Sequence, residues 1–255
     1  MNNLRILKQF NGCCFADLDL KQQGVIEDFQ LLFYIIRPPT PERVKYDIFD
    51  RVNRGGTPLN KQEMRNALYR GRCTRMLDKL CCSPEFLIAT GRSINKERMK
   101  DQYVVLRAMA FLMLHRGEFK DIPALQYRGD IDDFLARFMV YVNDNAPEKL
   151  IVDYENLFIR CMQISYDLLG ENGFRFSGNG IRRPINMPLF EALSYLFSFV
   201  PEKIDYTWAS RLILDIESVK EEFDDSRYFS GNIDSTTSVS FRFDRMDKII
   251  NRIQL

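Results

Sequence analysis

Over most of this chain, apolar residues recur at the spacing of amphipathic helices. In residues 42–53, for example, Val44 and Ile48 fall on one helical face. Polar stretches at 171–186 and 231–240 are expected to be loops. The same apolar spacing predicts further helices over residues 60–70, 72–80, 84–90, 96–116, 130–142, 148–169, 188–200, 204–222 and 241–253. The pattern therefore predicts a mainly α, multi-helix fold.

The first forty residues have a different pattern. Residues 4–7 and 30–36 are short apolar runs bounded by turn residues, which is typical of strands, and residues 17–29 between them resemble a helix. Two strands alone do not make a stable sheet. They are expected either to pair under the helix or to join a sheet of another polypeptide. The predicted organisation is a strand-helix-strand segment over residues 1–40 and a helical domain over 41–255.

Size and composition indicate a globular protein. The chain has 255 residues, of which 45% are hydrophobic and 28% charged, and its twenty Phe and eleven Tyr predict an aromatic core. No apolar run reaches the roughly 18 residues that span a membrane. The best run, residues 103–114, contains Arg107 and is expected to be a buried helix. No signal-peptide pattern is present at the N-terminus. A cytoplasmic location without a membrane partner is expected.

Few residues suit the common catalytic centres. The only histidine, His115, follows an apolar stretch and is expected to be structural. The six cysteines form no Cys-x-x-Cys spacing, so they are expected to be reduced core residues. These observations argue against zinc hydrolases, HNH-type nucleases and Ser-His-Asp triads, and no phosphate-loop or dinucleotide-binding motif is present. No catalytic or metal-binding residue is predicted, and the chain is not expected to be catalytic alone.

Charge is unevenly distributed along the chain. The net charge is +1, but residues 51–100 contain twelve Lys and Arg against four Asp and Glu, which leaves +8 in this stretch and −7 in the remainder. A basic segment beside a mildly acidic body concentrates positive potential, as expected of a protein that binds phosphates. The alternative is a solvated helical surface of mixed charge.

The most unusual cluster of residues is the helix, Gly-Gly turn and helix of residues 48–68. The two glycines allow close approach of a ligand to the backbone. The following helix, with Asn60 as N-cap, is expected to direct free N–H groups toward an anion. The alternative interpretation is a helix C-terminal cap followed by an ordinary capped helix. The candidate phosphate-binding residues are Arg51, Asn53, Arg54, Gly55, Gly56, Glu63 and Arg65.

This cluster resembles the signature F-x-R-[IVL]-N-x-G-G-x-x-L-x-x-x-E-[IM]-R of the ParB/sulfiredoxin-like restriction family, also called domain of unknown function 262, which includes GmrSD-type nucleases. The matching residues are Phe49, Arg51, Asn53, Gly55, Gly56, Leu59, Glu63 and Arg65. Residues 7–18, 183–192 and 235–253 also resemble the family, so the resemblance covers nearly the whole chain. It implies that residues 53–65 line a nucleotide or DNA site from the helical side.

The chain also departs from the family pattern. It lacks the Asp-Gly-Gln-Gln-Arg run of the nucleotide-handling α/β half and the optional C-terminal HNH domain. The resemblance therefore implies the helical half of a defence or restriction system, with a protein partner that carries the missing half. No cofactor is expected in this chain; an NTP with Mg²⁺ is implied for the assembled system, and DNA is implied as a further partner.

Two other interpretations remain open from the residues. A stand-alone DNA-binding or protein-interaction module could use residues 42–53 and 60–70 as a helix-turn-helix, although the turn over 53–60 is longer than usual. A gene remnant that keeps its fold without its activity is the other.

Overall fold

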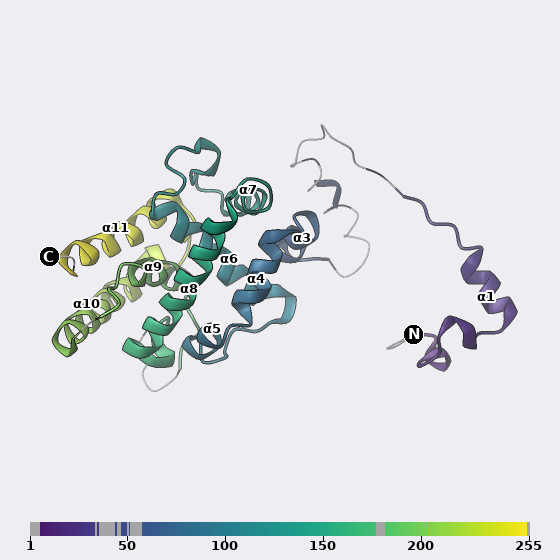
Figure 1. Cartoon of the computed structure of the whole chain (residues 1–255), viewed down its shortest axis with the longest axis horizontal. Helices are drawn as coiled ribbons and strands as arrows, with labels where there is room; N and C mark the ends of the chain where they lie inside the picture. Colours follow the sequence, from purple (N-terminus) through teal and green to yellow (C-terminus); the bar gives the residue numbers. More distant parts are fainter. Residues whose placement is uncertain are drawn as a thin grey trace. The chain divides into compact units, whose positions relative to one another are not determined.

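The computed structural model describes residues 6–33, 35, 44, 47–49, 51, 58–176, 182–203 and 205–253, and over these residues the chain is helical without strands. The prediction of a mainly α fold is confirmed for this part of the chain. Contacts divide the chain into two units, Met1–Asp47 and Ile48–Leu255, whereas the sequence placed the boundary after residue 40 (Figure 1). The two units are described separately.

The N-terminal unit contains short helical segments. The 3-10 helices η1, Lys8–Phe10, and η2, Phe15–Asp17, precede α1, Leu20–Glu27. The helix α1 lies within the range predicted to be helical. It begins at a capping box, in which the carboxylate of Asp19 accepts a hydrogen bond from the backbone N–H of Gln22 at 2.8 Å. The local sequence is therefore sufficient to start this helix.

The predicted N-terminal strands are absent from the described residues. Ile6 and Leu7 of the first run, and residues 30–33 and 35 of the second, form no strand; the other residues of both runs lie outside the described part. Instead, the second run leaves its apolar side chains exposed, with 79% of Leu32 accessible. A strand needs a partner edge for its backbone N–H and C=O groups, and the described part of this unit offers none.

The larger unit is a bundle of helices. Its long helices match the predicted ranges closely; α8, Glu148–Leu169, has the predicted ends. The other elements, in chain order, are α3, Lys61–Leu68; α4, Arg72–Cys81; α5, Pro84–Ala89; η3, Glu97–Met99; α6, Lys100–His115; η4, Pro123–Leu125; α7, Ile131–Asp144; η5, Gly170–Asn172; α9, Met187–Phe197; α10, Tyr206–Asp224; η6, Arg227–Phe229; and α11, Thr236–Ile253.

The last helix begins earlier than the sequence pattern predicted. It starts at Thr236 rather than at residue 241, so the predicted loop over 231–240 is wrong in its second half. Ser235 explains the difference: its Oγ accepts a hydrogen bond from the backbone N–H of Ser238 at 3.1 Å, the contact of an N-cap. The polar Ser and Thr residues that look like a loop are therefore the first turn of the helix.

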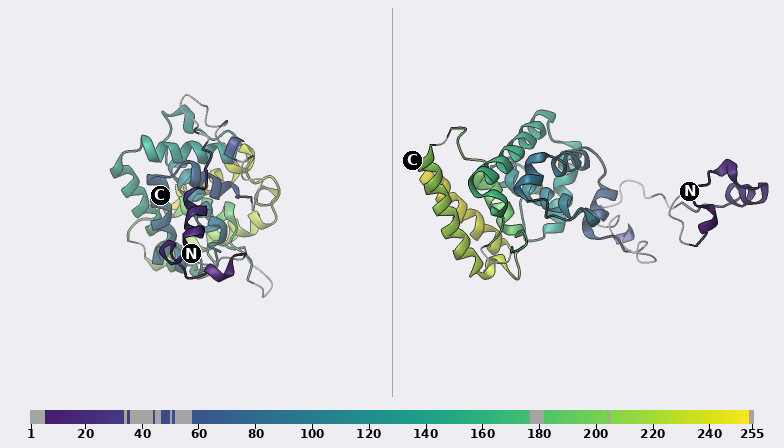
Figure 2. Two further views of the ribbon diagram at one scale, coloured as in Figure 1. Left: turned by 90° about the vertical axis from the view of Figure 1, so that its right-hand side faces the viewer. Right: turned by 90° about the horizontal axis from the view of Figure 1, so that it is seen from below.

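Two helices form the centre of the larger unit. The helix α6 packs against α4, α7, α8 and α9, and α9 also contacts α8 and α11. Nearly every residue of α9 is buried, which explains why this helix is apolar on all sides. The helices α10 and α11 lie alongside each other next to this centre (Figure 2). The core is rich in phenylalanine, as the composition predicted.

The single histidine belongs to this aromatic core. The ring of His115 stacks on Phe243 with centroids 3.6 Å apart and lies 5.7 Å from the ring of Tyr195. Its Nε2 is buried and has no hydrogen-bond partner among the described residues. Burial, with a contribution from the charge of Arg242, lowers the pKa of His115 from 6.5 to about 3. His115 is therefore a neutral core residue, as the sequence predicted.

This partly buried histidine predicts an acid-sensitive stability. The pKa of His115 is lower in the folded than in the unfolded chain. Protonation of this residue therefore does not affect the free energy of unfolding above pH 6.5, and it lowers that free energy as the pH drops from 6.5 toward 3. The expected slope is at most about 1.4 kcal/mol per pH unit. Urea unfolding of the unchanged protein should give a lower free energy of unfolding at pH 5.0 than at pH 6.5. The variant His115→Phe should lack this loss. A histidine NMR signal that titrates near its ordinary pKa in the folded protein would contradict this prediction.

Candidate functional site

The predicted phosphate-binding motif is only partly described by the structure. Arg51 is helical and exposed, and the other described residues of the predicted helix 42–53 are also helical. Glu63 and Arg65 lie on α3. The remaining candidate residues lie outside the described part of the chain: Asn53, Arg54, Gly55 and Gly56. The site formed by the Gly-Gly turn therefore stays a prediction.

The start of α3 is the capping box that the sequence predicted. The side-chain oxygen of Asn60 accepts hydrogen bonds from the backbone N–H groups of Gln62 at 2.8 Å and Glu63 at 2.9 Å. The carboxylate of Glu63 in turn accepts from the backbone N–H of Asn60 at 2.6 Å. These N–H groups are satisfied within the protein, so they are not the free donors that a phosphate was expected to find. The N–H groups of Gln62 and Glu63 are therefore not open to an anion.

Glu63 has a second structural contact. Its Oε2 pairs with Nη2 of Arg98 at 2.9 Å, and the same nitrogen donates to the carbonyl of Pro58 at 2.6 Å. The amide of Asn60 returns a hydrogen bond to the carbonyl of Arg98 at 2.7 Å. The hydrogen bond from Arg98 lowers the pKa of Glu63, despite the opposing effect of burial. Glu63 thus joins the start of α3 to η3.

Arg65 is buried, with 1% of its side chain exposed. Its Nη1 pairs with Asp132 of α7 at 2.7 Å, and its Nε and Nη2 donate to Oε1 of Gln62 at 3.1 and 3.0 Å. The guanidinium also lies over the ring of Tyr103, 5.4 Å from the centroid. Burial raises the pKa of Asp132, but hydrogen bonds from Lys61 and Arg65 outweigh it and lower the pKa overall. In this arrangement Arg65 connects α3 to α7.

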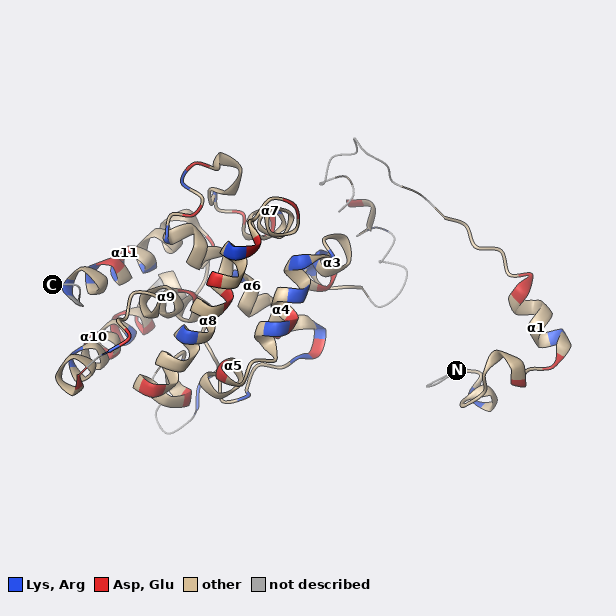
Figure 3. Cartoon of the chain, viewed as in Figure 1, with Lys and Arg blue, Asp and Glu red and all other residues tan. Residues whose placement is uncertain are grey.

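Exposed basic residues without a carboxylate partner lie further along the same segment. We call residues 58–100 the basic segment; Figure 3 marks Lys and Arg positions along its helices α3 and α4. Within it, several exposed cations form no ion pair with a described carboxylate. These are Arg70, Arg75, Arg92, Lys96 and Lys100. Their charge is available to a ligand, in contrast to that of Arg65.

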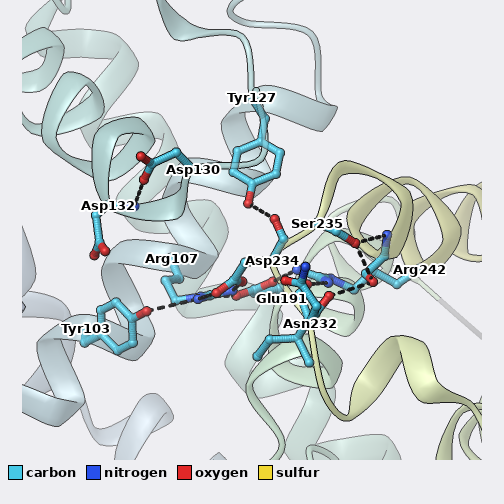
Figure 4. A network of polar contacts seen from close by, with 12 residues as sticks. Tyr103, Arg107, Tyr127, Asp130, Asp132, Glu191, Asn232, Asp234, Ser235 and Arg242 are labelled. Carbon is cyan, nitrogen blue, oxygen red and sulfur yellow. Dashed lines mark hydrogen bonds and ion pairs between the residues drawn. The ribbon is translucent and has the colours of Figure 1, made fainter.

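A second charged cluster lies in the core, between α6, α9 and α11 (Figure 4). Glu191 is fully buried and accepts from Nε of Arg107 through Oε1 and from Nη2 of Arg242, at 2.7 Å, through Oε2. Arg107 also donates through Nη2 to Asp234 at 2.6 Å and through Nη1 to the hydroxyl of Tyr103 at 3.0 Å. Two guanidinium groups thus share two carboxylates.

The charges of this core cluster cancel. Two arginines face Glu191 and Asp234, and both oxygens of Glu191 are occupied. Because no charge is left over for a ligand, the cluster is a structural connection between three helices rather than an open site. The sequence contained a signal for it: Arg107 and Glu191 each interrupt an apolar helix. Their partners could not be read from the sequence.

Comparison of the chain with family models, with curated proteins and with solved structures returns no match. In the part of the chain that the structure describes, no helix is long and apolar enough to cross a membrane. The described residues also contain no group of three or more His, Cys, Asp or Glu side chains arranged to hold a metal ion. The fold and charges thus define the class only as an all-α protein with a basic segment.

Proposed function

We propose that this chain binds the phosphates of DNA or a nucleotide and acts as the helical half of a GmrSD-like defence or restriction system. The resemblance of residues 48–68 to the family signature motivates the proposal. The observation that carries it is the set of exposed cations of the basic segment that have no carboxylate partner among the described residues, including Arg70 and Arg75. Cations of this kind release the counterions of DNA when they bind its phosphates.

The exposed apolar run of the N-terminal unit supports the need for a partner. Leu32, Phe33 and Ile35 are each at least 74% exposed and have high strand propensity. A partner with an open sheet edge would supply the hydrogen bonds and cover that this run lacks. In our proposal the partner carries the nucleotide-hydrolysing half and holds the NTP with its Mg²⁺. The helical chain contributes phosphate contacts rather than catalytic residues.

The double variant Arg70→Glu/Arg75→Glu should weaken binding to a labelled DNA duplex at least about tenfold, because two attractive contacts become repulsive. The slope of log affinity against log salt should also become shallower by about 2, since each lost phosphate contact contributes roughly 0.9 to its magnitude. Fluorescence anisotropy over a salt series measures both. A matched control is Lys120→Glu/Lys149→Glu, which changes the net charge equally at exposed positions outside the segment. Equal losses in the two variants would contradict a localised site.

The candidate motif residues are tested in the same assay. Arg51→Ala should weaken binding without lowering the melting temperature, because Arg51 is exposed. Arg65→Ala should instead lower the melting temperature, because it removes the buried partner of Asp132. Co-purification with the product of the adjacent gene, and a search of that product for Asp-Gly-Gln-Gln-Arg, tests the split-system part of the proposal. Absence of a partner would favour a stand-alone module.

A stand-alone DNA-binding module is the second candidate, and one observation favours it. The helices α3 and α4 are joined only by Tyr69, Arg70 and Gly71, the short glycine-containing turn of a helix-turn-helix. Asn143 holds this turn: its amide donates to the carbonyl of Tyr69 at 2.9 Å, and its oxygen accepts from the N–H of Cys73 at 2.9 Å. In this candidate the helix-turn-helix consists of α3 and α4, whereas the sequence suggested residues 42–53 and 60–70. Sequence-specific DNA binding by the chain alone would support it.

A further inference from the structure

A cavity of about 390 Å³ opens between the segment that follows α5 and the segment that precedes α9. Its lining includes the basic side chains of Lys100, Arg175 and Arg182 and the apolar side chains of Ile94, Ile185 and Met187. Pockets for small ligands typically start at about 300 Å³ and combine apolar walls with a few polar groups. The cavity lies entirely within the larger unit, and none of these residues belongs to the predicted motif.

Arg175 is the unusual residue of this cavity, because it is buried without a direct hydrogen bond or ion pair to a described carboxylate. Only 4% of its surface is exposed. Its guanidinium donates to neutral acceptors: the carbonyls of Thr90 and Glu171, each at 3.3 Å, the carbonyl of Arg183 and the hydroxyl of Ser93. These contacts orient the guanidinium but leave its positive charge uncompensated. A buried charge without a counter-ion is costly, which favours an anion beside it.

The carboxylate of Glu171 acts on Arg175 through its charge, but its ion pair is with Arg182. Arg182 pairs with Glu171 at 2.8 Å, and Arg183 pairs with Asp224, so each of these pairs is neutral. Lys100 is exposed and forms no ion pair with a described carboxylate. Burial and the charge of Arg182 lower the pKa of Arg175, against the opposing effect of the Glu171 carboxylate, but a guanidinium remains protonated in proteins. The cavity therefore carries two cations, Arg175 and Lys100, that form no ion pair with a carboxylate of the described residues.

The backbone beside the cavity is held in an uncommon conformation. Gly91 and Arg92 have φ values of 58° and 51°, and Arg98 and Met99 both have φ of 57°. A left-handed conformation is costly for residues other than glycine and is often found at binding sites. At position 91 a Cβ atom would lie 2.1 Å from Nη2 of Arg182. Glycine there allows the Arg182 side chain to cross the loop and reach the wall of the cavity.

We propose that this cavity binds a small organic monophosphate, with its phosphate between Lys100 and Arg175 and its organic part against Ile94, Ile185 and Met187. Nη1 of Arg175 makes a single hydrogen bond, so its second N–H is open to a phosphate oxygen, and Lys100 supplies a point charge. The apolar wall would bind a planar or hydrocarbon group and so distinguish an organic phosphate from inorganic phosphate. The proposal goes beyond the proposed function, because it concerns a pocket for one small molecule rather than contacts along DNA or at a partner.

The test is a binding titration of the full chain with two probes, phenyl phosphate and AMP. Calorimetry and NMR of the Ile and Met methyl groups detect the binding. At least one probe should bind and shift the methyl signals of Met187 and Ile185. Inorganic phosphate should bind more weakly than that probe, and adenosine, which lacks the phosphate, more weakly than AMP. Lys100→Glu should weaken binding at least roughly tenfold, since it replaces a favourable charged contact by a repulsive one.

Lys149→Glu is the matched control, because Lys149 is exposed and lies at the end of α8 opposite η5. It should leave probe binding unchanged. A second variant, Arg182→Ala, removes an exposed side chain of the cavity wall and should also weaken binding while the melting temperature is kept. The proposal is overturned if neither probe binds at concentrations up to about 10 mM. It is equally overturned if Lys100→Glu and Lys149→Glu have the same effect.

Lys100 belongs both to the basic segment and to the cavity, so a variant that spares the cavity residues separates the two proposals. Arg70→Glu/Arg75→Glu alters the basic segment away from the cavity residues, so it should leave probe binding intact. Loss of DNA binding with retention of phenyl phosphate or AMP would separate the two sites. Loss of probe binding in this variant, with the fold intact, would show that Arg70 and Arg75 bind the probe and would overturn the pocket.

Discussion

Glu191→Gln is expected to lower the free energy of unfolding by about 3–5 kcal/mol, the typical cost of breaking a buried ion pair. Glu191 is fully buried and pairs with both Arg107 and Arg242, which are at most 1% exposed. The amide keeps the size of the side chain but removes its negative charge. The two guanidinium groups are then left with only Asp234 as a counter-charge among the described residues. The loss is therefore electrostatic rather than a packing defect.

Urea unfolding followed by circular dichroism measures this effect. The matched control is Glu148→Gln, because Glu148 also pairs with an arginine, Arg72 at 2.7 Å, but is 78% exposed. An exposed pair contributes only about 0–1 kcal/mol, so the control should change little. Similar small losses in both variants would contradict the view that the core cluster joins α6, α9 and α11.

Phe111→Ala is expected to have a comparably large effect, about 3–5 kcal/mol, through lost packing and the cavity left behind. Phe111 is fully buried in α6. The centroid of its ring lies 5.2 Å from the ring centroid of Tyr127, 5.3 Å from that of Phe134 and 5.6 Å from that of Phe243. It therefore packs against three other parts of the bundle. The guanidinium of Arg242 lies 5.6 Å above it. Removing the ring therefore weakens the aromatic core and the charged cluster together.

The control for this substitution is Tyr206→Ala, which removes a ring that is 88% exposed at the start of α10. It is expected to change the stability by no more than about 0.5 kcal/mol, as is usual at the surface. Calorimetric melting of both variants provides the comparison. A small effect of Phe111→Ala, with the helical signal unchanged, would mean that neighbouring rings refill the space and that the core is less tightly packed than described.

The helices could be predicted from the sequence because their causes are local. Asn60 and Glu63 have the spacing of a capping box, and the structure contains this cap. The apolar period of residues 148–169 similarly predicted α8 with its observed ends. The start of α11 was missed because Ser235 was read as part of a polar loop rather than as an N-cap. The described residues of the two predicted N-terminal strands form none, because strand formation depends on a partner edge, which an apolar run does not reveal.

The roles of charged residues were decided only by the tertiary structure. Arg65 was predicted to contact a phosphate, but its partner Asp132 lies sixty-seven residues away in the chain and makes it an internal connection. Arg107 and Glu191 are separated by eighty-four residues, and Arg175 and Ser93 by eighty-two. The residue type determines that an arginine has donors that need hydrogen-bond acceptors. The local spacing of apolar residues determines the helix on which the arginine lies. Whether that acceptor is a buried carboxylate or a neutral carbonyl beside an open cavity depends on which helices pack together.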